Sequence, residues 1–221
     1  GAVPFHMWVP DVYDGAPTSV AAFVGTAPKI AAVVFAFRIL VTGMGTVHSD
    51  WAPMLAILAV ASLVVGNLAA IMQTNIKRML AYSTVSHMGF ILLAFMAGAV
   101  GFTAGLYYAI TYALMAAVSF GVLMVLSTKD IECENIKDLA GLNQRHAWFA
   151  FLMLLSMFSM AGIPPLMGFY AKFGVIMALL KQGHVWLSVF AVIMSLIGAF
   201  YYLRVVKVIY FDAPDHDQPV G

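Results

Sequence analysis

Charge and cysteine are scarce in this sequence of 221 residues. Lys, Arg, Asp and Glu together make up 10% of it, whereas about 25% is usual in soluble domains. The single cysteine, Cys133, excludes a disulfide framework and a cluster held by cysteines. A net charge of +1, without a long basic run, gives no reason to expect a nucleic-acid partner. With 63% hydrophobic residues, the composition is typical of a polytopic helical protein in a lipid bilayer.

Carboxylates are missing from the long apolar segments, because every acidic residue lies in a connection or in the tail. These residues are Asp11, Asp14, Asp50, Asp130, Glu132, Glu134, Asp138, Asp212, Asp215 and Asp217. Two lysines, in contrast, lie deep inside apolar stretches, Lys29 and Lys172. A lysine at the middle of a bilayer costs about 2.5 to 3.5 kcal/mol on insertion scales, so it is seldom retained for packing. The two lysines are therefore the leading candidates for a functional site.

The apolar segments predict an all-α transmembrane bundle that forms a single membrane domain over residues 1–221. The expected order is the end of a broken helix and a turn (1–16), four spans (17–41, 52–72, 79–98 and 104–127), a broken transmembrane helix (147–180), a last span (185–210) and a tail (211–221). Residues 128–146, which are rich in charge, are expected to form a connection between spans.

The segment 147–180 is too long for one straight span. A continuous helix of this length would reach about 51 Å, against a hydrocarbon thickness of about 30 Å. Gly162, Pro164 and Pro165 interrupt it, and the prolines cannot donate to the preceding turn. Two half-helices joined by an irregular link are therefore expected. Such links occur in membranes where they line a cavity or an ion site, and Lys172 lies about two turns beyond this one.

Buried amines can exchange a proton when the charge around them changes. A local distortion that admits water is expected near Lys29, since Pro28 cannot bond to the carbonyl of Val24 and Gly25 lies in the same turn. No acidic residue is available in either apolar region, so a carboxylate partner would have to come from other sequence or another subunit. The alternative is that both lysines form only structural ion pairs.

Three further polar groups have two interpretations each. His87, inside the span 79–98, is a proton relay or a core histidine bonded to the backbone. Lys77 is an anchor at the membrane interface or a residue of a proton pathway. The tyrosines of the span 104–127 can hold water, but packing between helices is the favoured interpretation.

Several runs of residues resemble the antiporter-like, proton-translocating membrane subunits of respiratory complex I. The runs are PFHMWVPD (4–11), DVYDGAP (11–17), TAPK (26–29), NIKR (75–78), YSTVSHMG (82–89), AGIPP (161–165) and GFYAKF (168–173). The resemblance covers nearly the whole sequence in order.

The resemblance implies an inverted-repeat fold of about fourteen helices, of which this sequence holds the second repeat. It implies that Lys29 links two half-channels and that Lys172 serves the exit side. It also implies that an essential glutamate and lysine lie upstream of Gly1. The expected function is proton translocation through buried lysines and water, in a multi-pass protein of the bacterial inner membrane.

The resemblance also implies that the redox chemistry belongs to partner subunits. NADH, FMN, iron-sulfur clusters and quinone are expected there, with no cofactor or metal on this chain. The chain would act in a translocase enzyme, coupled to electron transfer from NADH to quinone. Two alternatives stay open: a subunit of a cation/proton antiporter or of a membrane hydrogenase, and a membrane scaffold whose lysines only anchor partners.

Overall fold

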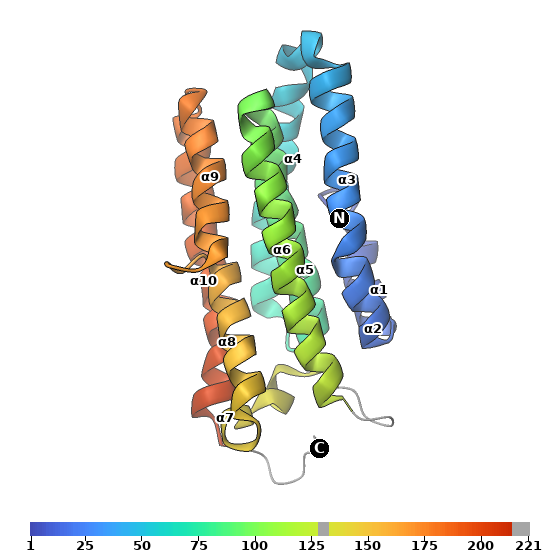
Figure 1. Ribbon diagram of the computed structural model, residues 1–221, viewed down its shortest axis with the longest axis vertical. Coiled ribbons are helices and arrows are strands. Elements are labelled where there is room, and N and C mark those ends of the chain that lie inside the picture. Colours follow the sequence, from blue (N-terminus) through green and yellow to red (C-terminus); the bar gives the residue numbers. More distant parts are fainter. Residues whose placement is uncertain (128–132, 214–221) are drawn as a thin grey trace.

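The computed structural model describes residues 1–127 and 133–213, and this part of the chain is helical and contains no β-strand (Figure 1). The helices are α1 (Trp8–Gly15), α2 (Thr18–Gly25), α3 (Ala27–Phe37), the π-helix η1 (Arg38–Gly43), the 3-10 helix η2 (Gly45–Val47), α4 (His48–Met72), α5 (Ile76–Met96), α6 (Gly98–Leu126), the 3-10 helix η3 (Ile136–Leu139), α7 (Leu142–Arg145), α8 (Ala147–Ala161), α9 (Met167–Lys181) and α10 (Val185–Phe211). The predicted all-α fold is confirmed. Residues 128–132 of the expected connection and 214–221 of the expected tail lie outside the described residues.

Five stretches of the described chain are long and apolar enough to cross a membrane. They are Thr18–Gly43, Gly45–Met72, Ile76–Met96, Gly98–Leu126 and Val185–Phe211. Their lengths of 21 to 29 residues suit a hydrocarbon layer of about 30 Å. The remaining long segment of the bundle is the pair of half-helices α8 and α9.

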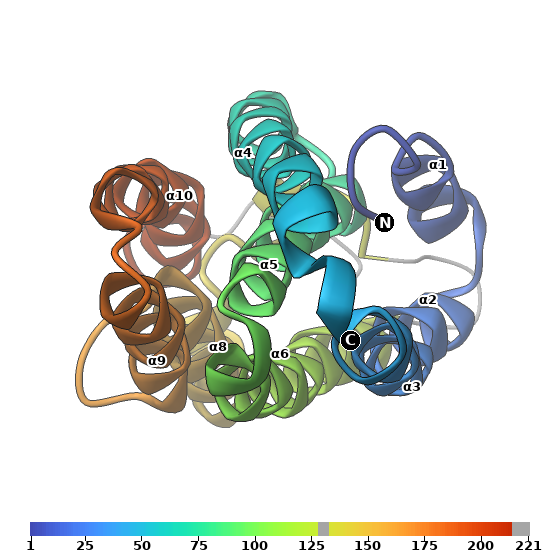
Figure 2. The same cartoon turned by 90° about the horizontal axis from the view of Figure 1, so that it is seen from above.

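Helix α5 forms the centre of the bundle, as the view from above shows (Figure 2). In its most apolar window 83% of the residues are buried, against 33% for α4 and α10 and 17% for the span that contains α2 and α3. The outer helices therefore present apolar side chains outwards, as expected of helices that face lipid or other transmembrane helices. Polar residues on α5, in contrast, lie in the interior of the protein.

Small residues allow α4 and α5 to approach closely. A Cβ atom on Gly66 would lie 2.5 Å from the backbone nitrogen of Ser86, and one on Gly89 would lie 2.9 Å from Cγ of Leu63. Close backbone contact of this kind drives helix association in membranes, where the surrounding lipid is as apolar as the side chains. The packing fixes the polar face of α5 relative to the rest of the bundle.

The first span is interrupted between α2 and α3. Thr26 has φ −121° and ψ −86°, outside the helical region, and its hydroxyl donates to the carbonyl of Ala22 at 2.8 Å. Pro28 has no N–H, so the turn that ends at this point cannot complete its backbone hydrogen bonds. Lys29 consequently lies in the first turn of α3, directly beyond the interruption.

The interruption between α8 and α9 begins at Gly162, which has φ +89°. The N–H of Gly162 donates to the carbonyl of Ser159 at 3.0 Å, and the N–H of Ile163 donates to the carbonyl of Phe158 at 3.0 Å. This arrangement is typical of a helix that ends on a left-handed glycine. Pro164 and Pro165 cannot continue the helix. The carbonyl of Ala161, at the end of α8, is therefore left free for another donor.

Helix α1 is held against the start of α5 by an ion-pair cluster. Arg78 donates to Asp11 at 3.0 Å and to Asp14 at 3.2 Å. Asn75, which caps α5 by accepting from the N–H of Arg78 at 3.0 Å, also donates to Asp14 at 2.7 Å. This cluster places the inner face of α1, and with it Tyr13, beside α5.

Candidate functional site

The ammonium of Lys29 lies within a cage of three hydroxyl groups. Its Nζ donates to Oη of Tyr13 at 2.8 Å, to Oγ1 of Thr84 at 3.3 Å and to Oη of Tyr112 at 3.4 Å. It also lies 4.9 Å from the centre of the Tyr112 ring and 5.4 Å from that of Tyr13. Helices α1, α5 and α6 each contribute one hydroxyl, so the cage exists only in the folded bundle.

This cage suits both protonation states of the amine. An ammonium has three N–H donors, and the cage offers three oxygen acceptors. A neutral amine has a lone pair, and a hydroxyl can turn to donate to it. The ion pairs of the described residues do not include Lys29, whose partners there are the three hydroxyls.

His87 lies on α5 and is 3% exposed. Each of its two ring nitrogens forms a hydrogen bond. Its Nδ1 lies 2.7 Å from Oη of Tyr108, and its Nε2 lies 2.9 Å from Oη of Tyr202. The same hydroxyl of Tyr202 contacts Oγ of Ser83. The partners of His87 are therefore two phenol hydroxyls and not a backbone carbonyl, and a phenol hydroxyl can donate or accept a proton.

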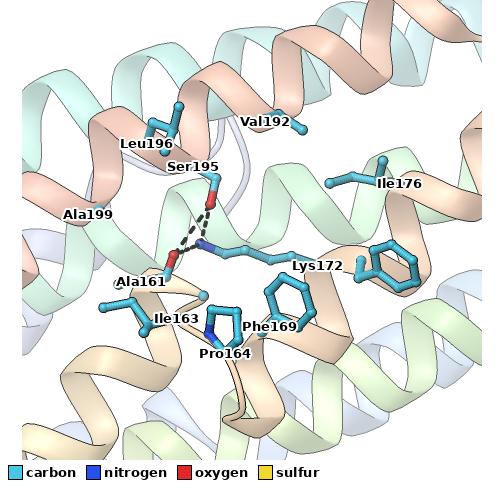
Figure 3. Close-up of a pocket in the computed structure, with 12 residues that line it drawn as sticks. Ala161, Ile163, Pro164, Phe169, Lys172, Ile176, Val192, Ser195, Leu196 and Ala199 are labelled. Carbon is cyan, nitrogen blue, oxygen red and sulfur yellow. Dashed lines mark hydrogen bonds between the residues drawn. The ribbon is translucent and has the colours of Figure 1, made fainter.

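Lys172 occupies the interruption between α8 and α9 (Figure 3). Its Nζ donates to the carbonyl of Ala161 at 2.9 Å and to Oγ of Ser195 at 2.8 Å. The Ala161 carbonyl is at the C-terminal end of α8, where the helix dipole carries partial negative charge, so it attracts an ammonium. The side chain is 8% exposed. The helix interruption thus creates the binding partner of this lysine.

A cavity of about 460 Å³ lies beside Lys172, between the half-helices and α10. Its lining is apolar except for the lysine and Ser195; Phe169, Ile176 and Leu196 are among the apolar members. The volume exceeds that of several water molecules, and Lys172 and Ser195 are the side chains of the lining that could bind water.

The three polar clusters follow one another through the bundle. The Tyr112 ring, which belongs to the Lys29 cage, lies 4.7 Å from the His87 ring, centre to centre. Tyr108 stacks on Phe90 at 5.6 Å, and the Lys172 ammonium lies 5.4 Å from the centre of the Phe90 ring. Between residues of the described chain, no direct hydrogen bond joins one cluster to the next, so transfer between them needs water or a side-chain movement.

Lys77 does not behave as an interfacial anchor, and that alternative is wrong. Its side chain is 1% exposed and lies inside the first turn of α5. The adjacent Cys133 is 3% exposed, and burial raises the pKa of its thiol to about 12, with Asp138 adding to the effect. Lys77 lies ten residues before His87 on α5, which is about 15 Å along the helix axis.

Two tyrosines of α6 join that helix to its neighbours through polar contacts. Tyr108 and Tyr112 bond to His87 and to Lys29, whereas Tyr107 is 40% exposed. Tyr13 and Tyr202 were not predicted as site residues at all. For Tyr108 and Tyr112 the sequence contains one signal of a shared site, because residues four positions apart lie on the same face of a helix. Within residues 1–127 and 133–213, no group of His, Cys, Asp and Glu could hold a metal ion.

Interrupted helices with charged groups beside the interruptions, in a polytopic bundle, are typical of membrane transporters. The chain belongs to the NADH:quinone oxidoreductase/Mrp antiporter transmembrane family, whose sequence model matches residues 1–198. This confirms the predicted family.

Two curated relatives cover the whole chain. The NADH-quinone oxidoreductase subunit N of Neisseria gonorrhoeae is 84% identical over 221 residues, and that of Thioalkalivibrio sulfidiphilus is 59% identical over 221 residues. The runs DVYDGAP (11–17) and YYLRV (201–205) point to the same subunit. The chain spans 46% of the length of each of these relatives.

Solved structures share the fold. A chain of respiratory complex I from Thermus thermophilus matches with a TM-score of 0.84 and 32% identity, over 99% of this chain and 48% of that one. A chain of the Mrp complex from a Dietzia species matches with a TM-score of 0.89 and 26% identity, over 99% of this chain and 41% of that one.

Proposed function

We propose that this chain is part of a proton-translocating membrane subunit of NADH:quinone oxidoreductase. Lys29 passes a proton through the His87 cluster toward Lys172, with water between the clusters. NADH, FMN, iron-sulfur clusters and quinone are held by partner subunits, and their electron transfer drives the movement of charge. The subunit lies in the bacterial inner membrane among other membrane subunits of the complex. Two curated relatives of the same name, at 84% and 59% identity, support this assignment.

The observation that carries the mechanism is the series of protonatable groups within one bundle. Lys29, His87 and Lys172 are each bonded to neutral hydroxyls or a carbonyl, and none forms an ion pair within the described residues. A permanent carboxylate partner would fix the charge of a lysine, whereas neutral partners leave it responsive to neighbouring charge. This arrangement favours transfer of a proton over a structural ion pair. Lys77, buried at the start of α5, is not assigned a step.

The test is replacement of Lys29 or Lys172 by Met in the full-length subunit within the assembled complex. Met keeps the apolar stem and removes the amine, so we expect the number of protons translocated per NADH oxidised in sealed vesicles to fall. Lys181→Met is the matched control, because Lys181 is exposed at the end of α9. Unchanged translocation in both variants would favour the scaffold alternative.

A cation/proton antiporter subunit is the second candidate, and a membrane hydrogenase subunit falls in the same group. The similarity to the Mrp complex chain, with a TM-score of 0.89, favours it. The two functions differ in what drives the protons. Proton movement that depends on NADH oxidation in inverted vesicles, and not on an imposed Na⁺ gradient, would support the oxidoreductase subunit.

A further inference from the structure

A buried amide on α4 is bonded to α10 at two places. The side chain of Asn67 is 1% exposed. Its Nδ2 donates to the backbone carbonyl of Met194 at 3.1 Å, and its Oδ1 accepts from Oη of Tyr201 at 3.1 Å. Because a carbonyl oxygen can only accept, the contact with Met194 fixes which end of the amide carries the N–H groups. The direction of both hydrogen bonds therefore follows from the geometry.

The glycine at position 198 makes room for this amide. Gly198 lies four residues after Met194 and three before Tyr201, so the three residues share one side of α10. A Cβ atom on Gly198 would lie 2.9 Å from Oδ1 of Asn67, too close to be accommodated without a shift. The amide thus lies directly against the backbone of α10, where both of its hydrogen bonds can form.

The same stretch of α10 carries partners of two proton-transfer candidates. Ser195, directly after the first contact point of the amide, accepts from Nζ of Lys172 at 2.8 Å (Figure 3). Tyr202, directly after the second contact point, bonds to Nε2 of His87 at 2.9 Å. Residues seven positions apart lie on one face of a helix, so the two contact points share a face and the two hydroxyls share the adjoining face. Anything that fixes the first face also places the second.

Helix α10 is an outer helix, and only 33% of its most apolar window is buried. Apolar contacts are not directional, so they fix the rotation and height of a helix less sharply than hydrogen bonds do. Arg204 also ties α10 to the end of α4, by donating to the carbonyls of Ile71 and Gln73. Arg204 lies beyond both hydroxyls in the chain, whereas Asn67 acts within the stretch that carries them.

We propose that Asn67 is a positioning residue that holds α10 at the rotation and height at which Ser195 and Tyr202 reach their proton-carrying partners. This inference rests on the proposed proton-transfer roles of Lys172 and His87. Its geometric part, the placement of the two hydroxyls by one amide, can be measured without proton translocation.

The first test is the nitrogen NMR spectrum of the assembled complex with ¹⁵N-labelled histidine. The signals of His87 are those that disappear in the His87→Gln variant. Asn67→Leu replaces the amide by an apolar side chain of similar size, so α10 can turn or slide and Tyr202 should move relative to Nε2 of His87. We therefore expect the His87 signals to shift. Unchanged His87 signals in an assembled Asn67→Leu complex would overturn the inference.

Two further variants separate positioning from general stability. Ser62→Ala is the matched control, because Ser62 is buried on the same helix and its hydroxyl bonds to Leu58 and Val3. It should lower the unfolding temperature and leave the His87 signals in place, and a shift equal to that of Asn67→Leu would refute a specific role of the amide. Tyr201→Phe removes one of the two bonds and should give a smaller shift. If Asn67→Leu fails to assemble, an unshifted spectrum of Tyr201→Phe overturns the inference.

The rate of proton translocation provides the second measurement. We expect Asn67→Leu to slow it roughly fivefold, the equivalent of one neutral hydrogen bond. Combined with Ser195→Ala, the loss should be smaller than the product of the two single losses, because both changes act on the same contact. A full product would contradict action through α10. If Lys172→Met and His87→Gln leave translocation unchanged, the proposed function fails, whereas the His87 signals still decide the role of Asn67.

Discussion

The two intramembrane lysines, of which Lys29 is half-buried and Lys172 buried, have different hydrogen-bond partners. Lys29 bonds to three hydroxyls from three helices, all of which can reverse from acceptor to donor. Lys172 bonds to one hydroxyl, Ser195, and to the Ala161 carbonyl, which can only accept. A neutral amine keeps two N–H donors and gains a lone pair, so Lys29 can accept from any one of its three hydroxyls, whereas Lys172 can accept only from Ser195 while it still donates to Ala161.

This difference shows that the two helix interruptions serve the lysines in different ways. The break at Gly162 directly supplies the carbonyl that holds Lys172 and lies beside a cavity of about 460 Å³. The break at Thr26 supplies no bond to the Lys29 ammonium; it allows α3 to start at the level of the tyrosine cage. Lys172 thus depends on the backbone geometry at its break, and Lys29 depends on the packing of neighbouring helices.

The largest effect should come from Gly162→Ala. A side chain at φ +89° is strained, and its Cβ would lie 3.0 Å from Cδ of Lys172. We expect a loss of about 1 to 2 kcal/mol in stability from the left-handed backbone. Displacement of the Lys172 side chain would add the loss of its bonds to both Ala161 and Ser195, about 1.5 to 3 kcal/mol each. The measurements are the unfolding temperature and the rate of proton translocation, and both should fall.

The counterpart at the other site is Gly25→Ala, whose Cβ would lie 3.1 Å from Oη of Tyr13 on a helical backbone. It should disturb the Lys29 cage but lower the unfolding temperature less. Gly174→Ala, with its nearest neighbour at 3.6 Å, is the control on α9. Equal losses for Gly162→Ala and Gly25→Ala would contradict the dependence of Lys172 on its backbone break.

A medium effect should separate the two sets of partners. Ser195→Ala leaves Lys172 with one partner, while Tyr13→Phe leaves Lys29 with two. Since a hydrogen bond to a charged group contributes about 1.5 to 3 kcal/mol, we expect Ser195→Ala to slow proton translocation roughly tenfold or more. Tyr13→Phe should slow it less. Ser195→Thr, which keeps a hydroxyl, should restore the rate, and a larger loss in Tyr13→Phe would reverse the comparison.

The smallest effect should come from the ring beside Lys172. Phe90→Leu removes the ring whose centre lies 5.4 Å from the ammonium, and Phe95→Leu removes a ring that is equally buried on the same helix. We expect Phe90→Leu to cost more by about 0.5 to 1 kcal/mol, the contribution of a cation–π contact. Thermal unfolding of both variants measures this difference, and identical values would exclude the contact.

The helical fold and the break at Gly162 could be predicted because they depend on local chemistry. Long apolar runs require hydrogen-bonded helices in lipid, and a Gly-x-Pro-Pro run cannot continue one. The same reasoning identified Lys29 and Lys172 as deeply placed amines. It failed for Lys77, because a basic residue at a helix end gives the same pattern whether its side chain points outwards or, as here, into the bundle.

The sequence by itself determined that the chain spans a membrane, where its helices are interrupted, and that two amines lie without local carboxylates. Only the tertiary structure decided which groups replace the carboxylates. Tyr13, Thr84 and Tyr112 come from three helices far apart in the sequence, and Tyr202 reaches His87 from a fourth. Hydrophobic periodicity specifies which face of a helix is buried, but not which residues of other helices meet it, because that depends on how the helices pack.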